Sequence, residues 1–308
     1  MRFRFSPWLL VVGLVLICGL SIGILMYFRR AVAVTPQAMV SYLPQGEQTV
    51  VYIDVNALRQ SGILGRLFGS TVGEESEYKL FVAESGFDYK TDLDTILYSA
   101  SNVQKLFLLK GRFDWKMLIK YASEHGGACV NGFCRVPASK PNQTVSFYAL
   151  RGDLMALGVS QDKESASNIR VRPVSKVQLD LPAQPIWMSM PVSVLKEIEN
   201  PPAGTRQFIK VLDNADKVVF SLGPQDDRFL LAMDVTCKTQ EDAAVVRAEL
   251  ESLTGLLQKF IARENQKPNP NDLSGVLTSG KFSRTDRHVL AYWPIPRPLI
   301  YSLGTGGG

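Results

Sequence analysis

The chain has few residues with the chemistry of an active site. Only two histidines, His125 and His288, occur among its 308 residues, so histidine-dependent catalysis would have to use one of them. His125 lies in "SEHGG", where a cation suits the end of a helix and glycine stops it, and His288 lies in a strand-like stretch. No GxSxG, HExxH or Walker loop occurs. We therefore expect no catalytic residue, no metal site, no cofactor and no enzymatic activity.

Two pairs of neighbouring carboxylates could in principle bind a metal ion. Asp92 and Asp94 stand in "TDLDT", and Asp226 and Asp227 stand in "GPQDDR". Paired carboxylates suit Mg²⁺ or Ca²⁺. Turns and helix starts place aspartates in the same patterns for purely structural reasons, however. We interpret both pairs as structural.

The pair Cys129 and Cys134 is placed symmetrically about an Asn-Gly dipeptide at 131–132. Asn-Gly is a strong signal for a two-residue hairpin, which would set the two cysteines opposite each other with Cα atoms about 4.5 Å apart. That distance permits a disulfide. A zinc site would need further ligands, and a thioredoxin-like motif would separate the cysteines by two residues, whereas four lie between them here. We favour a structural disulfide over free thiols, and free thiols over a metal site; the disulfide would indicate an oxidising compartment.

The N-terminus contains an uncharged run from Trp8 to Phe28. At about 1.5 Å per residue this run would span ~30 Å, the thickness of the hydrocarbon core of a bilayer. It predicts an uncleaved signal anchor, with a cleaved signal peptide and a lipoprotein site at Cys18 as alternatives. Gly19 and Gly23, four residues apart in "GLSIG", are typical of close helix packing and allow a homodimer through this span.

Charge outside the N-terminus is nearly balanced. Arg2, Arg4, Arg29 and Arg30 are the only charged side chains of the first 30 residues, and without them 30 basic residues face 29 acidic ones. A near-neutral body argues against binding of nucleic acid. The arginines and the N-terminal amine slightly favour a cytoplasmic N-terminus. We expect a single-pass protein of the bacterial inner membrane with a periplasmic body.

After the anchor, hydrophobic patterns alternate between strand and helix periods. "TVVYIDV" from Thr49 alternates as a strand does, and "DWKMLIKYASEHGG" is predicted as a helix capped by Asp114. A later helix, from about residue 239 to 265, is expected to bury a stripe that includes Val246 and ends at Phe260.

These elements occur twice in the same order. "ILYSASNVQKLFLLKGRF" from Ile96 can be laid without a gap on "VVFSLGPQDDRFLLAMDV" from Val218. We predict an α+β protein with two related units of the ferredoxin-like, split β-α-β-β-α-β type. The predicted organisation is a cytoplasmic tail and transmembrane anchor (1–30), a linker (31–47), a first unit (48–170), a linker (171–184), a second unit (185–303) and a disordered tail (304–308).

Three segments carry a resemblance to known proteins. "LPQGEQTVVYIDVNALRQSGIL", "FDYKTDLDTILYSAS…FLLKGRFD" and "VVFSLGPQDDRFLLAMDVTCKTQEDA" resemble those of uncharacterised bacterial, acidobacterial-type membrane-anchored envelope proteins with a duplicated α+β domain. The resemblance covers most of residues 43–300. It implies an extracytoplasmic α+β body on a membrane anchor, and it transfers no catalytic residue to this chain.

We therefore expect a binding or scaffolding role in the cell envelope, with the membrane and an unidentified envelope protein as partners. The alternative is a carrier or sensor of an apolar ligand, for which Trp187, Phe220 and Tyr292 are the candidate lining residues. They could equally be core residues. A hydrolase with an unrecognised carboxylate site is the least favoured hypothesis.

Overall fold

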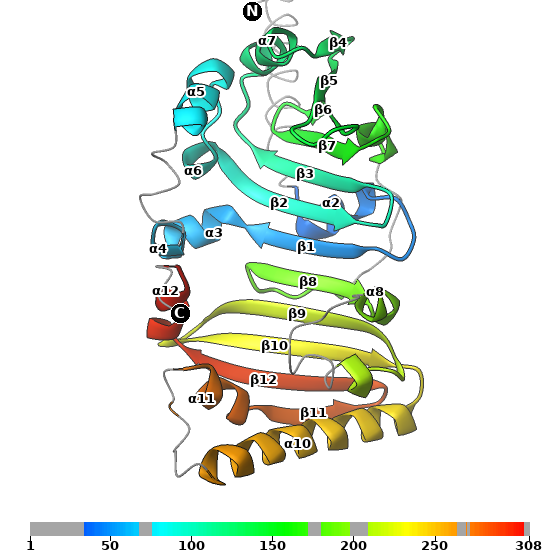
Figure 1. Ribbon diagram of the computed structural model, residues 1–308, viewed down its shortest axis with the longest axis vertical. Coiled ribbons are helices and arrows are strands. Elements are labelled where there is room, and N and C mark those ends of the chain that lie inside the picture. Colours follow the sequence, from blue (N-terminus) through cyan, green and yellow to red (C-terminus); the bar gives the residue numbers. More distant parts are fainter. Residues whose placement is uncertain are drawn as a thin grey trace, which may run out of the picture.

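A sheet of twelve strands forms the centre of the part of the chain that the structure describes (Figure 1). The computed structural model describes residues 34–67, 76–171, 180–197, 209–263, 269 and 272–304. The strands are β1 (Thr49–Asp54), β2 (Leu93–Ala100), β3 (Lys105–Gly111), β4 (Ala128–Val130), β5 (Phe133–Pro137), β6 (Thr144–Arg151), β7 (Leu154–Ser160), β8 (Ile186–Pro191), β9 (Ala215–Gln225), β10 (Arg228–Cys237), β11 (Lys281–Thr285) and β12 (His288–Pro296).

Helices occupy the connections between these strands. They are α2 (Pro36–Tyr42), α3 (Val55–Gln60), α4 (Ile63–Leu67), α5 (Ser76–Ser85), α6 (Tyr89–Asp92), α7 (Trp115–Glu124), the 3₁₀ turn η2 (Ser165–Asn168), α8 (Val192–Lys196), α10 (Gln240–Arg263), α11 (Leu273–Thr278) and α12 (Arg297–Gly304). Among the described helices, none is both long enough and apolar enough to cross a bilayer. The predicted span Trp8–Phe28, with Gly19 and Gly23, lies outside the described residues.

The α+β class is confirmed, and the sheet consists of two halves that match strand for strand. The strand order is β11-β12-β10-β9-β8-β1-β2-β3-β7-β6-β5-β4. Counted outward from the β1–β8 boundary, β1-β2-β3-β7-β6 in the first half corresponds to β8-β9-β10-β12-β11 in the second. Each first strand is followed by a short helix, α3 or α8, and each third strand by a longer one, α7 or α10. The hairpin β4–β5 is an addition to the first half.

The predicted ferredoxin-like topology is wrong, because in that arrangement another strand lies between the two strands that flank a helix. Here β1 pairs directly with β2 across the intervening helices, and every strand pair is antiparallel. The helix of a split β-α-β unit carries the chain back along the sheet, so that its two flanking strands run parallel. The connection from β1 to β2 contains helices of 6, 5, 10 and 4 residues. These helices gather at one end of the strands, on the left of Figure 1, so β2 starts where β1 stops.

Strands β1 and β8 join the two halves into one continuous sheet. Residues 50–53 of β1 pair with residues 186–189 of β8, and we call this pairing the seam. At its centre Tyr52 lies opposite Trp187, and the two rings stack with centroids 5.3 Å apart and planes 13° from parallel. Trp187 is 1% exposed and Tyr52 is 6% exposed, so the seam is part of the core.

The ungapped alignment of the two halves does not hold across the turn that it contains. It matches Tyr98 with Phe220 and Phe107 with Phe229. Tyr98 does pair with Phe107, but Phe220 pairs with Met233. The strands β9 and β10 are longer than β2 and β3. The ungapped alignment can therefore match corresponding positions in one strand of each hairpin, but not in both.

Helices pack on both faces of the sheet. On one face of the first half, Met39 of α2 and Leu43, which directly follows the helix, pack in a core with Tyr52, Leu97 and Leu108. The stretch 31–47, expected as a linker, therefore includes a packed helix. The other face carries α7 in the first half and α10 in the second.

Helix α10 departs from its predicted stripe at its C-terminal end. Val246 and Leu250 are 1% exposed and contact the sheet core, as predicted. Phe260 is 64% exposed, because the second half of the helix lies mostly beyond the sheet core. The predicted stripe therefore holds through Leu253, which still packs against the core, and fails at Phe260.

The hairpin β4–β5 has the predicted turn and register. Asn131 and Gly132 have φ angles of 51° and 79°, the left-handed values that a type I′ turn requires. Cys129 lies opposite Cys134, and the two form a disulfide. Cys134 is fully buried and pairs on its other side with Phe147 of β6.

Replacement of Trp187 by alanine should destabilise both halves, because it removes the largest fully buried side chain from the seam. We expect the free energy of unfolding to fall by about 3–5 kcal/mol, measured by urea denaturation. Trp115→Ala, which changes a partly exposed tryptophan of α7, is the matched control and should cost clearly less. Equal losses in the two variants would contradict a central role for the seam.

The cysteines should differ in reactivity when the full-length protein is extracted without reductant. Burial, followed by the nearby Asp242 carboxylate, raises the pKa of the Cys237 thiol to about 11, so it stays protonated at neutral pH. In the native protein we expect mass spectrometry to find none of Cys129, Cys134 and Cys237 alkylated, and after denaturation only Cys237. Alkylation of Cys129 and Cys134 before reduction would refute both the disulfide and the oxidising compartment.

Candidate functional site

A largely apolar pocket of about 370 Å³ lies in the first half of the molecule. Helices α5 and α7 and the strands β3, β5, β6 and β7 provide most of its wall. Its lining residues are Phe81, Phe87, Leu109, Phe113, Leu118, Tyr121, Val136, Pro137, Ala138, Ser139, Val145, Phe147, Met155 and Leu157. The volume falls within the range of small-molecule sites.

Residues at its two ends determine where α7 begins and ends. Asp114 caps the helix as predicted, because its side chain accepts hydrogen bonds from the backbone N–H groups of Lys116 and Met117 at 3.0 and 3.1 Å. The helix stops before Gly126, whose φ of 75° suits glycine. Between these limits, Leu118 and Tyr121 lie three residues apart and both line the pocket.

The sheet supplies the floor of the pocket through strand alternation. Val145 and Phe147 project from the same face of β6, and Met155 and Leu157 from the same face of β7. Phe147 and Met155 are 7% and 5% exposed. Cys134 lies opposite Phe147 and belongs to the same buried cluster, so the disulfide is on this same face of the sheet, beside α7.

Helix α5 closes one side of the pocket through few contacts. The rings of Phe81 and Tyr121 meet edge to face at 5.3 Å. Glu84 Oε2 lies 2.8 Å from Nε2 of His125, which ties the end of α5 to the end of α7. Among its described side chains only Ser85 is buried, so α5 depends on these contacts more than on a core of its own.

The lining offers apolar contact and little else. Among the described residues that line the pocket, none carries a carboxylate, an imidazole, an ammonium or a guanidinium group. Burial, followed by the nearby Glu84 carboxylate, raises the pKa of Tyr121, so its hydroxyl stays neutral at physiological pH. This arrangement can hold an apolar molecule.

The three aromatic residues proposed from sequence as ligand contacts do not converge on this pocket. Trp187 lines a hollow of about 400 Å³ beside the seam, and Tyr292 lines an adjoining one of about 190 Å³. The two hollows share Lys217 and Val219. Phe220 follows Val219 on β9, so it projects from the opposite face of the sheet.

Sequence reasoning missed the residues that do form the apolar pocket. Phe81 and Phe87 come from a stretch that showed neither a clear helical nor a clear strand period. Phe113 and Phe147 come from separate elements that only the tertiary fold brings together. The available signal was the high number of phenylalanines between residues 81 and 147, which by itself indicates a core as readily as a site.

Both histidines contact carboxylates. His125 contacts Glu84, and Nδ1 of His288 lies 2.9 Å from Asp234 across the β10–β12 pairing. These four side chains are between 34% and 45% exposed. Such exposed pairs are typical of surface contacts between neighbouring elements.

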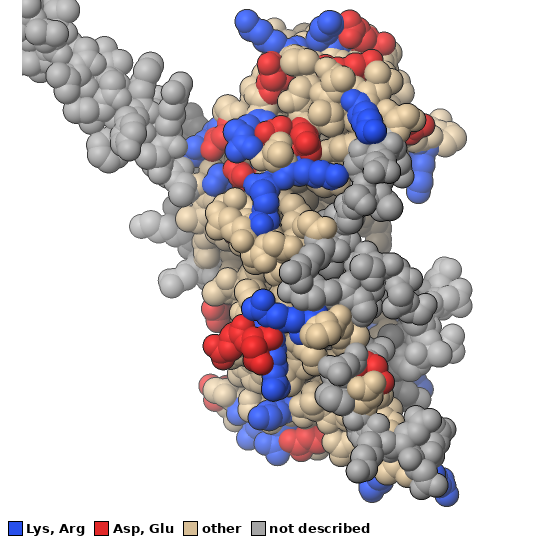
Figure 2. All heavy atoms as spheres, turned by 90° about the vertical axis from the view of Figure 1, so that its left-hand side faces the viewer, with Lys and Arg blue, Asp and Glu red and all other residues tan. Residues whose placement is uncertain are grey.

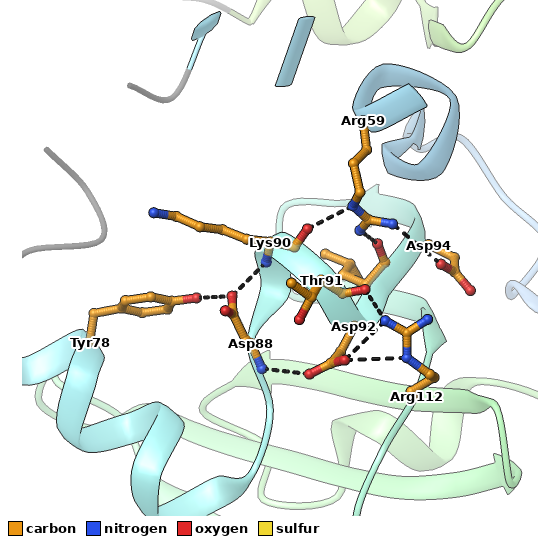
Figure 3. A network of polar contacts seen from close by, with 9 residues as sticks. Arg59, Tyr78, Asp88, Lys90, Thr91, Asp92, Asp94 and Arg112 are labelled. Atoms are coloured by element: carbon orange, nitrogen blue, oxygen red, sulfur yellow. Dashed lines mark hydrogen bonds and ion pairs between the residues drawn. The ribbon is translucent and has the colours of Figure 1, made fainter. Parts of the chain in front are cut away.

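Asp92 and Asp94 belong to a polar network rather than to a shared cation site (Figure 3). Arg112 contacts Asp92 at 3.1 Å, and Arg59 contacts Asp94 at 3.8 Å, so each carboxylate has its own arginine. Arg59 also donates hydrogen bonds to the carbonyl oxygens of Lys90 and Leu93, at 2.7 and 2.5 Å. The network thereby holds α3 against α6 and the start of β2.

The same network reaches the base of α5. The hydroxyl of Tyr78 donates to Asp88 at 2.6 Å, and the backbone N–H of Asp88 donates to Asp92 at 3.0 Å (Figure 3). Phe87, which lines the apolar pocket, directly precedes Asp88. The carboxylates therefore help to position the pocket without entering it.

The second carboxylate pair is explained by a turn. Asp226 has a φ of 50° in the tight connection between β9 and β10, and Asp227 lies 3.6 Å from Arg228. In the described part of the chain no group of three or more His, Cys, Asp and Glu side chains is arranged to hold a metal ion.

Acidic and basic side chains are interspersed on the side of the molecule that carries α3 to α6, the left-hand side of Figure 1 (Figure 2). The arginine–aspartate pairs of the network account for part of this mixture. A surface of mixed sign does not produce the strong field of one sign that attracts polyanions. The expectation of no nucleic-acid partner stays a prediction.

Comparison with known proteins gives only a distant likeness. No protein-family model matches the chain, and no curated protein does. Among solved structures, crystal form I of TP0453 has a TM-score of 0.46 at 9% identity, covering 87% of this chain and 96% of that one. Crystal form III of TP0453 has a TM-score of 0.44 at 7% identity, covering 85% and 96%. This level of similarity assigns neither family nor function, and the resemblance to acidobacterial-type envelope proteins stays a prediction.

The polar network should stabilise the folded protein less at acidic pH than at neutral pH. Partial burial acts to raise the pKa of Asp92, but the hydrogen bonds from Asp88 and Arg112 outweigh it, and the pKa lies below its usual 3.8. Because the folded-state pKa is lowered, the stabilisation is present above pH 3.8 and is lost as the pH falls through the folded-state value.

Asp92→Asn should therefore lower the free energy of unfolding by about 1 kcal/mol at pH 7, and the difference from wild type should shrink towards pH 3. Urea unfolding at the two pH values measures this. Asp94→Asn is the control, because its single arginine contact is longer and should contribute less. A penalty for Asp92→Asn that grows on acidification would contradict the assignment.

Proposed function

We propose that this chain is a non-catalytic binding protein that holds an apolar ligand in the pocket between α5, α7 and the sheet. The observation that carries the proposal is the pocket itself, which is about 370 Å³ in volume and lined almost entirely by aromatic and aliphatic side chains. A close-packed core leaves few voids larger than a water molecule. A ligand would bury this apolar surface, which favours binding.

The cellular setting of the proposal comes from the sequence and the disulfide. The uncharged run Trp8–Phe28 has the length and flanks of a membrane anchor. The Cys129–Cys134 disulfide is of a kind that persists outside the cytoplasm. Together they support an inner-membrane protein whose body lies in the periplasm, where an apolar molecule would need a carrier or could be sensed.

Val145→Trp should remove ligand binding with little effect on the fold. Val145 lines the pocket from β6 and is partly exposed, so an indole there would occupy the cavity. Tryptophan is favourable in strands, and we expect the free energy of unfolding to change by less than about 1 kcal/mol.

Native mass spectrometry of the full-length protein, extracted from membranes in mild detergent, measures the bound species. Wild type should retain an apolar molecule in a 1:1 complex that organic extraction then releases for identification. Val145→Trp should lack it. Val219→Trp is the matched control, because Val219 is a partly exposed strand valine that lines the hollows on the other face. Loss of the adduct in Val219→Trp but not in Val145→Trp would refute this pocket as the site.

A further inference from the structure

Two of the residues that line the apolar pocket, Tyr121 and Ser139, carry a side-chain hydroxyl group. Tyr121 comes from α7, and Ser139 comes from the exposed connection between β5 and β6. In the described part of the chain neither hydroxyl has a hydrogen-bond partner. A hydroxyl can both donate and accept, so each can pair with an uncharged polar group of a ligand.

The electrostatics near Tyr121 are unfavourable to an anion. The Glu84 carboxylate is close enough to raise the pKa of Tyr121, and the ring of His125 lies 4.2 Å from the ring of Tyr121. His125 contacts that same Glu84 carboxylate. A ligand carboxylate buried there would be desolvated beside another carboxylate.

The described lining contains no cation that could compensate such a charge. Lys140 directly follows Ser139, but it is exposed and does not line the pocket. Burial of an unpaired charge costs far more than burial of a hydroxyl that finds a hydrogen-bond partner.

We infer that the pocket is selective for a neutral apolar ligand that ends in a hydrogen-bonding group, such as a long-chain alcohol, over the carboxylate of the same chain. This inference rests on the proposed function and specifies its ligand class. Tyr121 and Ser139 are the residues that determine the preference, and the aromatic side chains hold the hydrocarbon portion.

Photoaffinity labelling of the full-length protein in detergent tests the inference. The two probes are hexadecanol and hexadecanoic acid that carry a diazirine at the same carbon. Labelling is measured on the peptides that contain Leu118 and Phe147. It is normalised to labelling of the peptide at 8–28, which corrects for the different amounts of probe in the micelles. We expect the alcohol to label the pocket peptides at least about tenfold more than the acid.

Variants identify the groups responsible. Tyr121→Phe and Ser139→Ala should each reduce labelling by the alcohol by about twofold to tenfold, the effect of one hydrogen bond, and leave labelling by the acid unchanged. Lys140→Gln should alter neither. Unchanged far-ultraviolet circular dichroism and an unchanged unfolding midpoint show that each variant is folded.

The possible results separate the inference from the proposed function. Equal or stronger labelling by the acid, particularly if Lys140→Gln removes it, overturns the preference for a neutral ligand and leaves an apolar-ligand site. Absence of pocket labelling by both probes, or labelling that Val145→Trp does not reduce, overturns the proposed function together with the inference.

Discussion

Backbone pairing between β1 and β8 is the interaction on which the rest of the structure depends. It turns two similar halves into one antiparallel sheet, and the Tyr52–Trp187 stack makes this boundary as buried as any other part of the core. Without it each half would expose a long unpaired strand with an apolar face. The helices on both faces are positioned relative to this common sheet, and so is the pocket.

The two halves share a strand plan but use their helix-covered face differently. In the second half α10 packs directly on the sheet through Ala243, Val246 and Leu250, and this face forms part of the largest buried cluster. In the first half the face is covered by the shorter α7, the added hairpin and α5. The aromatic pocket lies between these pieces. The part of the duplicated plan that differs between the halves is thus where the candidate site is found.

Local features were predictable from sequence, and long-range ones were not. The strand at Thr49, the Asn-Gly hairpin with its cysteine pair, and the Asp114 cap each depend on residues within a few positions of one another. The antiparallel order depends on where the helices between β1 and β2 lie, which no period in the sequence indicates. The pocket joins Phe81 to Phe147, residues from separate elements. Of the proposed trio, Trp187 and Tyr292 line adjoining hollows, whereas Phe220 projects from the opposite face of the sheet.

The two edge strands of the sheet, β4 and β11, have features that disfavour the addition of further strands. An open edge offers unpaired backbone groups to another copy of the chain and invites growth into fibres. At one edge β4 has only three residues, and the disulfide fastens it to β5, so it presents a short and inflexible template. At the other edge β11 carries Lys281 and Arg284, whose charges would repel an identical strand. Edges of this kind keep neighbouring copies of the chain from joining into one larger sheet.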